Sequence, residues 1–167
     1  QYAGMSFVDF AHLKERNIKN GILDYNRQKT GTPMRLEILD TAELMRKELM
    51  GDKRPASGYL FPFLSGTKTG YEAYLEYNAA LSRFNRNLKA LKKAARIASD
   101  VTSYTIRHSF AMALKEQNVP IEMISELLGH KSIKTTQIYL RSFSLEKMTE
   151  VNSTCFGCVY NYVSKVG

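Results

Sequence analysis

The chain has 167 residues, and its 24 Lys and Arg exceed its 16 Asp and Glu, which gives a formal net charge of +8 at pH 7. With 44% hydrophobic and 11% aromatic residues, the composition fits one globular domain and excludes a disordered tail, a collagen-like chain or a coiled-coil fibre. The basic surplus favours an anionic partner, above all nucleic acid. No apolar run approaches the roughly 20 residues that span a bilayer, and no signal peptide is visible, so we expect a cytoplasmic protein away from membranes.

The first forty residues predict a short helix followed by a hairpin. Ser6 is a predicted N-cap, and Asp9 follows three residues later, at the start of an apolar run. Two partly alternating runs, 22–26 and 34–38, flank the turn segment Lys29-Thr30-Gly31-Thr32-Pro33. This pattern predicts an antiparallel β-hairpin with a basic tip.

The middle of the chain predicts two helices separated by a loop. Residues 40–50 have helical spacing, and residues 51–69 are rich in Gly, Pro and Ser. Residues 71–98 predict the longest helix, with a buried apolar face that includes Leu81, Phe84, Leu88 and Leu91. Basic residues occupy much of the rest of that helix, at Arg83, Arg86, Lys89, Lys92, Lys93 and Arg96. They predict either a solvated helix face or a row of phosphate contacts.

Three shorter helices are predicted over 103–117, 120–128 and 132–140, with Gly129 ending the second. The tail 144–167 is amphipathic and then apolar. With one hairpin among many helices, the predicted fold is mainly α with a small antiparallel β-sheet, an α+β fold. The chain also begins as if inside an element, so we expect a C-terminal fragment of a longer protein, forming a single domain over 1–167.

Metal and nucleotide motifs are missing from the sequence. No His-Glu-x-x-His, no carboxylate pair at ligand spacing and no phosphate-binding Gly-rich loop is present. The only metal-like pair is Cys155 and Cys158, and the nearest histidine, His130, lies 25 residues upstream. We therefore expect free thiols and no cofactor.

The segment from Ser103 to Tyr139 carries the chemistry. It contains Ser-Tyr-Thr-Ile-Arg-His-Ser-Phe over 103–110, then Leu-Gly-His-Lys-Ser over 128–132 and Thr-Thr-Gln-Ile-Tyr over 135–139. Attack on a DNA phosphodiester without a metal needs a nucleophile, cations or donors for the phosphate oxygens, and an acid for the leaving oxygen. Tyr, Arg, His and Lys supply all of these groups.

These blocks resemble the catalytic domain of the tyrosine recombinases, the phage-integrase family, and especially integrases of bacterial mobile elements. The resemblance implies that the protein is a site-specific DNA recombinase in which Tyr139 attacks the scissile phosphate and forms a 3′-phosphotyrosine without a cofactor. It implies that Arg107 clamps the phosphate and His130 donates a hydrogen bond to it. Lys29, at the hairpin, would protonate the leaving 5′-oxygen. The family implies a homo-tetramer on double-stranded DNA in the full-length protein, with accessory DNA-bending proteins as further candidate partners.

Two catalytic positions depart from the family pattern. Tyr104 replaces the histidine of a His-x-x-Arg block, and its hydroxyl, with an ordinary pKa near 10, is a poor proton shuttle at pH 7. Ser6 stands where the family has its first arginine, and serine brings no charge. Loss of one such donor costs about 2.7 to 4 kcal/mol of transition-state stabilisation unless another cation substitutes.

The remaining predictions concern the surface and the second histidine of the Arg-His pair. Beside the cleavage site, we expect DNA contacts from seven residues: Arg83, Arg86, Lys89, Lys93, Lys131, Thr135 and Thr136. His108 follows Arg107 directly, so we predict a structural role with its ring pointing elsewhere. The apolar tail 144–167 is a candidate for packing on a neighbouring protomer.

Two alternatives stay open. The segment 121–140 could form a helix-turn-helix that reads DNA without cleaving it. The second alternative is a recombinase fold that is catalytically impaired by Ser6 and Tyr104.

Overall fold

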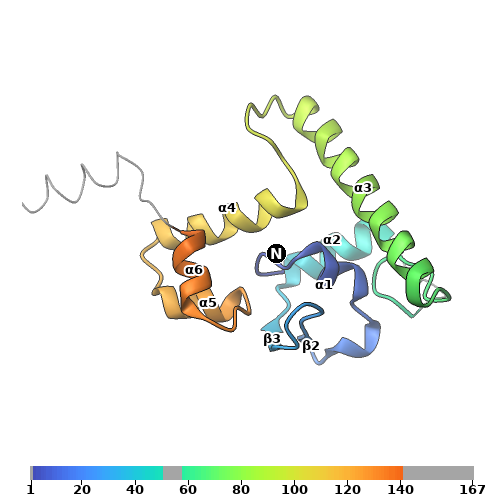
Figure 1. Ribbon diagram of the computed structural model, residues 1–167, viewed down its shortest axis with the longest axis horizontal. Helices are drawn as coiled ribbons and strands as arrows, with labels where there is room; N and C mark the ends of the chain where they lie inside the picture. The colour runs from blue at the N-terminus through green and yellow to red at the C-terminus, as the bar shows by residue number, and fades with distance from the viewer. Residues whose placement is uncertain (1, 51–57, 141–167) are drawn as a thin grey trace, which may run out of the picture.

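The computed structural model describes residues 2–50 and 58–140. The candidate protomer contact in the tail 144–167, and the two cysteines within it, lie outside the described residues. Two groups of elements stand beside each other, one around a small sheet and one of three helices (Figure 1). The predicted fold, mainly α with a small antiparallel sheet, is therefore confirmed.

The first group surrounds a three-stranded antiparallel sheet in the order β1-β2-β3. Its elements are α1 (Phe7–His12), the 3-10 turn η1 (Glu15–Asn17), β1 (Ile18–Lys19), β2 (Ile22–Asn26), β3 (Pro33–Glu37) and α2 (Asp40–Met50). The predicted hairpin is present, with Asp24 opposite Arg35. The sequence reading missed β1, which pairs with β2 across an Asn20-Gly21 turn. Both turn residues have positive φ, as a two-residue hairpin turn with Asn-Gly requires.

The sheet group has two hydrophobic clusters. In the first, Leu13, Leu23 and Leu60 pack together with Tyr25 and Met34, beneath the hairpin. The second joins α1 to α3 (Gly70–Ala94) through Phe7, Ala11, Leu64 and Ala80. Aromatic rings fill the space between the clusters, with centroids 4.7 Å apart for the Phe7–Phe84 pair and 4.2 Å apart for the Phe10–Phe61 pair. α1 is thereby held on the sheet group, which fixes the position of the residues just before it.

The second group consists of α4 (Ser103–Glu116), α5 (Ile121–Leu127) and α6 (Ile133–Tyr139). All three helices were predicted, and no predicted end differs from the observed one by more than one residue. Thr102 caps α4 by accepting from the backbone N–H of Thr105. The buried core of this group is formed by Ala111, Ile124, Leu128 and Leu140. Because α6 ends in that core, the last residue of α6, Tyr139, faces α4.

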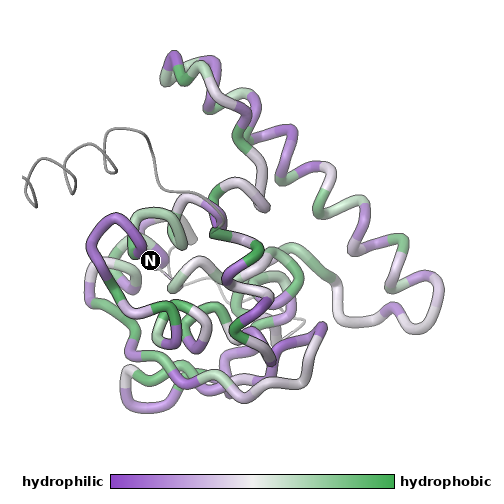
Figure 2. Tube along the Cα trace, turned by 60° about the vertical axis from the view of Figure 1, so that its left-hand side comes forward, coloured by the Kyte–Doolittle hydropathy of each residue, from purple (hydrophilic) through white to green (hydrophobic). Residues whose placement is uncertain are grey.

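The long helix α3 differs from its prediction. It ends at Ala94, four residues early, and Arg96 beyond it has a φ of +53°. The expected apolar face is covered only as far as Phe84, which packs on Phe7, and Asn85, which accepts from the backbone N–H of Ser103. Leu91, in a later turn, is 61% exposed. The last turns project away from both groups (Figure 1), and hydrophilic residues recur along the helix (Figure 2). Periodicity located the helix but could not show where its apolar face loses its cover from the rest of the described chain.

No helix among the described residues is long and apolar enough to cross a membrane.

Candidate active site

Tyr139, the predicted nucleophile, is surrounded by three other rings. Those of His108, Tyr104 and His130 meet the Tyr139 ring edge to face, with centroid distances of 4.9, 5.7 and 6.1 Å. Its hydroxyl oxygen, Oη, is buried and has no hydrogen-bond partner among the described residues. A buried hydroxyl without a partner is costly, because it has lost water and gained nothing in return. A polar group from another molecule would satisfy this hydroxyl only if the side chains around it moved aside.

Burial raises the pKa of Tyr139 to about 12. The nearby Tyr104 hydroxyl adds to that increase, whereas the positive charge of Arg107 opposes it. At pH 7 the free protein therefore holds Tyr139 as the neutral phenol. Only additional positive charge, or removal of the proton as a bond forms, would make the oxygen a strong nucleophile.

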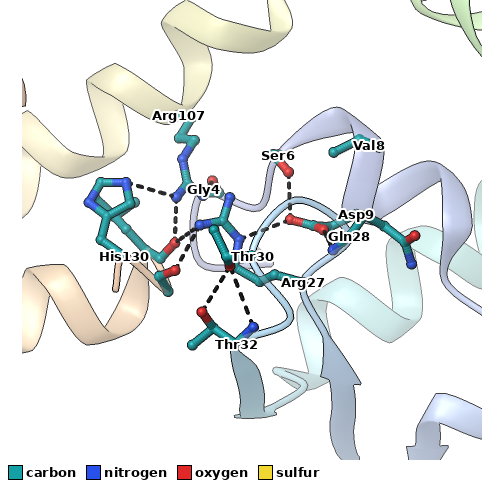
Figure 3. Close-up of polar contacts among 12 residues, drawn as sticks. Gly4, Ser6, Val8, Asp9, Arg27, Gln28, Thr30, Thr32, Arg107 and His130 are labelled. Carbon is teal, nitrogen blue, oxygen red and sulfur yellow. Dashed lines mark hydrogen bonds and ion pairs between the residues drawn. The ribbon is translucent and has the colours of Figure 1, made fainter. Parts of the chain in front are cut away.

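Arg107 comes from the first half of α4, and its side chain is buried, with 7% of the residue exposed. Nη1 donates to the carbonyl oxygen of Gly4 at 2.7 Å, and Nη2 donates to that of Leu128 at 2.5 Å. The guanidinium thus joins the turn before α1 to the end of α5 (Figure 3). Desolvation lowers the pKa of Arg107, and the neighbouring Arg27 charge lowers it further, although an arginine stays charged at any physiological pH.

His130 lies between Arg107 and α6. Its Nε2 is 3.5 Å from Arg107 Nη2, and its Nδ1 is 2.9 Å from Oγ1 of Thr136. A guanidinium can only donate, so Nε2 must be the acceptor in the first contact. The proton of the neutral ring is then on Nδ1 and is donated to Thr136. For His130 to donate to a phosphate through Nε2, its contact with Arg107 must break and a proton must reach Nε2.

The His130 environment predicts a pH dependence of stability. Burial, followed by the charges of Arg107 and Arg27, lowers the pKa of His130 from 6.5 to about 4. Between pH 6.5 and pH 4 the unfolded chain takes up a proton at His130 that the folded chain does not. The contribution of the neutral imidazole to the free energy of unfolding is therefore full at pH 7 and is lost as the pH falls through that window. We expect the loss to be on the order of 2 kcal/mol, allowing for partial exposure of the ring.

Urea unfolding at pH 7 and pH 4.5 measures this effect, with the wild type compared with His130→Gln. The variant should be less stable at pH 7 but lose less stability on acidification. An identical drop in both proteins would contradict the assignment, because the other titrating groups are common to the two chains.

Ser6 occupies the N-cap position of α1, but its side chain does not cap the helix. Instead, its hydroxyl donates to Oδ2 of Asp9 at 2.5 Å. The predicted N-cap position is therefore confirmed, but the side-chain hydrogen bond of a cap is absent, because the hydroxyl is turned toward the buried carboxylate. Ser6 is also turned toward Asp9 and makes no polar contact with Arg107, His130 or Tyr139.

Arg27 is a residue of this site that the sequence reading missed. It follows the last residue of β2, and it is 7% exposed. Its Nε donates to Oδ2 of Asp9 at 3.2 Å, and its Nη1 donates to the carbonyl oxygens of Leu128 and Gly129, each at 2.9 Å. Asp9 also accepts from the backbone N–H of Gln28 through Oδ1, at 2.7 Å. A signal was available, since Asp9 stands among apolar residues, a buried acid requires a cationic partner, and Arg27 stands two residues before the hairpin lysine.

The turn at Gly129 brings the two groups of elements together. Gly129 has a φ of +60°, and a Cβ at this position would collide with the side chains of Arg27 and Met34. Only glycine combines this backbone conformation with so close an approach. The turn therefore lies directly on the base of the hairpin, and it places His130 beside both arginines.

Lys29 is exposed at the hairpin tip, beside α1 and the N-terminal turns of α3. With Tyr74 and Tyr77 it lines a shallow hollow, and no described polar contact links it to Arg107, His130 or Tyr139. The structure thus brings four of the six predicted catalytic residues together: Arg107, His130, Tyr139 and Tyr104. Ser6 is linked to them only through Asp9 and Arg27, and Lys29 makes no described polar contact with them. Tyr104 is at the edge of the group and is 64% exposed.

Six of the seven predicted DNA contacts are exposed: Arg83, Arg86, Lys89, Lys93, Lys131 and Thr135. Thr136 requires a correction, because it is fully buried and its hydroxyl faces His130 Nδ1. Its role in this arrangement is to orient the imidazole. The four α3 residues lie within about a third of the helix circumference, so they form one continuous basic stripe.

His108 requires a second correction. The sequence predicted that its side chain points away from the site. Its ring is instead the nearest of the three that surround Tyr139, at 4.9 Å between centroids. Adjacent helix residues point in directions about 100° apart, which is compatible with both Arg107 and His108 facing the α5–α6 end. His108 packs the tyrosine ring in place.

Among residues 2–50 and 58–140, no group of three or more His, Cys, Asp or Glu side chains is arranged to hold a metal ion. The groups joined around the site are the guanidiniums of Arg27 and Arg107, the imidazole of His130, the phenol of Tyr139, and the carboxylate of Asp9 with its Ser6 hydroxyl.

Comparison with known proteins identifies the family of this arrangement. Residues 3–146 match the phage integrase family. The chain belongs to that family. Among similar members of known sequence, a probable integrase/recombinase of Methanocaldococcus jannaschii is 32% identical over 133 residues, which cover 77% of this chain and 38% of that protein. Tyrosine recombinase XerD of Lacticaseibacillus casei is 50% identical over 54 residues, or 32% of this chain and 18% of XerD. The chain thus spans well under half the length of these phage integrase family relatives.

Solved structures support the fold. The crystal structure of XerA recombinase superposes with a TM-score of 0.67 at 23% identity, covering 92% of this chain and 54% of XerA. The Tn1549 transposon integrase, solved in complex with a circular intermediate DNA, gives a TM-score of 0.63 at 15% identity, covering 90% of this chain and 55% of the integrase. The fold of this phage integrase family member is that of a tyrosine recombinase catalytic domain.

Proposed function

We propose that this protein is a site-specific DNA recombinase that cuts and rejoins DNA through a 3′-phosphotyrosine at Tyr139. The observation that carries the proposal is the convergence of an orphaned, buried Tyr139 hydroxyl with Arg107 and His130, from three separate elements. Family membership supports the same chemistry. The substrate is double-stranded DNA, and the chain acts as the catalytic domain of a longer protein.

In the proposed reaction, Tyr139 Oη attacks the scissile phosphorus. The Oη–P bond forms, the bond from phosphorus to the 5′-oxygen breaks, and the phenolic proton is released to water. The ammonium of Lys29 donates its proton to the departing 5′-oxygen, which requires the hairpin tip to close on the DNA. Rejoining is the reverse sequence, with a 5′-hydroxyl from the other duplex as the attacking group.

The phosphate takes over hydrogen bonds that the free protein makes internally. Arg107 directs its Nη groups at two backbone carbonyls and at His130, and its Nε makes no hydrogen bond to any described residue. Breaking the Arg107–His130 contact frees one N–H of Arg107 and allows His130 to donate through Nε2. The two residues then hold the non-bridging oxygens, where charge develops during attack.

The exposed basic stripe on α3 and the surface residues Lys131 and Thr135 provide contacts to neighbouring phosphates. Such contacts are sequence-independent and position the duplex on the catalytic residues. In the longer protein we expect a homo-tetramer on two duplexes, with the tail 144–167 on a neighbouring protomer.

A substrate with a nick beside the scissile phosphate tests the proposal, because loss of the short fragment traps the covalent intermediate. Incubation with a nicked cognate site should give a protein–DNA adduct that survives denaturation, and peptide mapping should place the DNA on Tyr139. Specific binding without adduct would overturn the proposal and favour a recombinase fold that is impaired by Ser6 and Tyr104, or a reader of DNA.

A further inference from the structure

We propose that Arg27 is the second arginine of the phosphate site and supplies the positive charge that Ser6 does not. It reaches the site from the end of β2, whereas Ser6 precedes α1, so the charge comes from a different element of the fold. This inference rests on the proposed cleavage of DNA. It deepens that proposal by assigning a residue to the binding of the scissile phosphate.

The first argument is the position of the guanidinium. Arg27 Nη1 and Arg107 Nη2 both donate to one oxygen, the carbonyl of Leu128. Two donors on the same acceptor are necessarily neighbours, so the two guanidiniums lie side by side (Figure 3). An anion bound at Arg107 is therefore within the field of Arg27 as well.

The second argument is the balance of buried charge. The buried charged residues in the described chain are Asp9, Arg27 and Arg107, which gives two cations against one carboxylate. An unpaired buried charge is costly, and proteins keep one where a ligand of opposite sign completes the site. One negative charge would balance the cluster, and a phosphodiester carries one.

The third argument is the number of free donors. Arg27 uses Nε for Asp9 and Nη1 for the two turn carbonyls, whereas Nη2 makes no hydrogen bond within the described residues. Nη2 also retains access to solvent, because among the described residues only the Tyr2 and Tyr139 hydroxyls are both buried and without a hydrogen-bond partner. Asp9 and the turn hold the guanidinium in place, and one edge of it stays open to an anion.

Ser6 and Asp9 complete the arrangement. Asp9 accepts from Ser6 Oγ, from Arg27 Nε and from the backbone of Gln28, so both carboxylate oxygens are used. An arginine at position 6 would compete with Arg27 for the same carboxylate. The serine is small and donates one hydrogen bond, which leaves room for Arg27 beneath the turn.

A neutral phosphate analogue distinguishes charge neutralisation from a structural role. The nicked substrate is prepared with either a normal phosphodiester or a methylphosphonate at the scissile position, and adduct formation is timed for both. With the phosphodiester, Arg27→Gln should reduce the rate by about 100- to 1000-fold, as expected for loss of one phosphate-binding donor. With the uncharged methylphosphonate, the reduction should be below about tenfold, because there is less charge to balance.

Two further variants complete the experiment. Arg27→Lys keeps the charge and should retain more phosphodiester cleavage than Arg27→Gln. If Arg27→Gln does not fold, Arg27→Met takes its place, because it also removes the charge and keeps an unbranched side chain. Arg35→Gln removes an exposed arginine from the neighbouring strand and should behave as the wild type on both substrates.

The outcomes separate the two proposals. If the uncharged variant at position 27 slows cleavage of both substrates equally, or slows neither, the inference about Arg27 is overturned while the recombinase proposal stands. If the wild type forms no adduct with either substrate, the recombinase proposal fails first.

Discussion

Replacing Tyr139 with Phe is expected to abolish the covalent protein–DNA adduct while leaving DNA affinity unchanged. The variant lacks the only atom that can bond to the phosphorus in the proposed reaction. It should fold at least as well as the wild type, because the hydroxyl that it removes is buried without a partner, and deleting an unsatisfied polar group releases its desolvation cost. Adduct yield on the nicked substrate, DNA affinity and the unfolding midpoint in urea measure the three effects.

Tyr104→Phe is the matched control, because it removes a neighbouring hydroxyl from the same group of rings. This variant should still form the adduct on Tyr139. An adduct that persists in Tyr139→Phe, or that disappears in Tyr104→Phe alone, would place the nucleophile on another residue.

Replacing Arg107 with Gln is expected to reduce the rate of adduct formation by about 100- to 1000-fold, corresponding to about 2.7 to 4 kcal/mol of transition-state stabilisation. It should also destabilise the folded protein, because the carbonyls of Gly4 and Leu128 lose their charged donor inside the structure. We expect a loss of about 2 to 4 kcal/mol in the free energy of unfolding.

Arg86→Gln, on the exposed face of α3, is the control for this substitution. It removes the same charge without removing a buried hydrogen bond, so its free energy of unfolding should match that of the wild type. Its rate of adduct formation at saturating DNA should also be unchanged. Equal rates for Arg107→Gln and the wild type at saturating DNA would rule out Arg107 as a phosphate ligand.

The order of helices and the hairpin could be predicted from local signals. The bounds of α2 were predicted to the residue. The bounds of α4, α5 and α6 were predicted to within one residue, because Ser103 begins α4 and Gly129 separates α5 from α6. Local signals fail where an interaction spans a long sequence distance. Ser6 has the local pattern of a helix cap, but its hydroxyl proton goes to Asp9, which is held by Arg27 from the end of the hairpin.

The residues around Tyr139 show the same limit. Arg107 and His130 were found because they stand at characteristic distances along the chain from the tyrosine. Arg27 was not, since its contacts with Leu128 and Gly129 join positions 101 and 102 residues apart. The burial of Thr136 and the ring contact of His108 also depend on how α4 and α6 pack, which the helix periods do not specify.

The shared carbonyl of Leu128 has a further consequence. Arg27 from the sheet group and Arg107 from the helical group both hold this one oxygen, so the two guanidiniums that join the halves of the fold are also the two that bind the phosphate in the proposed reaction. Under that proposal, substrate affinity and rigidity of the free protein depend on the same two side chains. A variant selected for resistance to heat would tend to tighten this junction and lose catalytic rate, which makes the junction a site of trade-off between stability and activity.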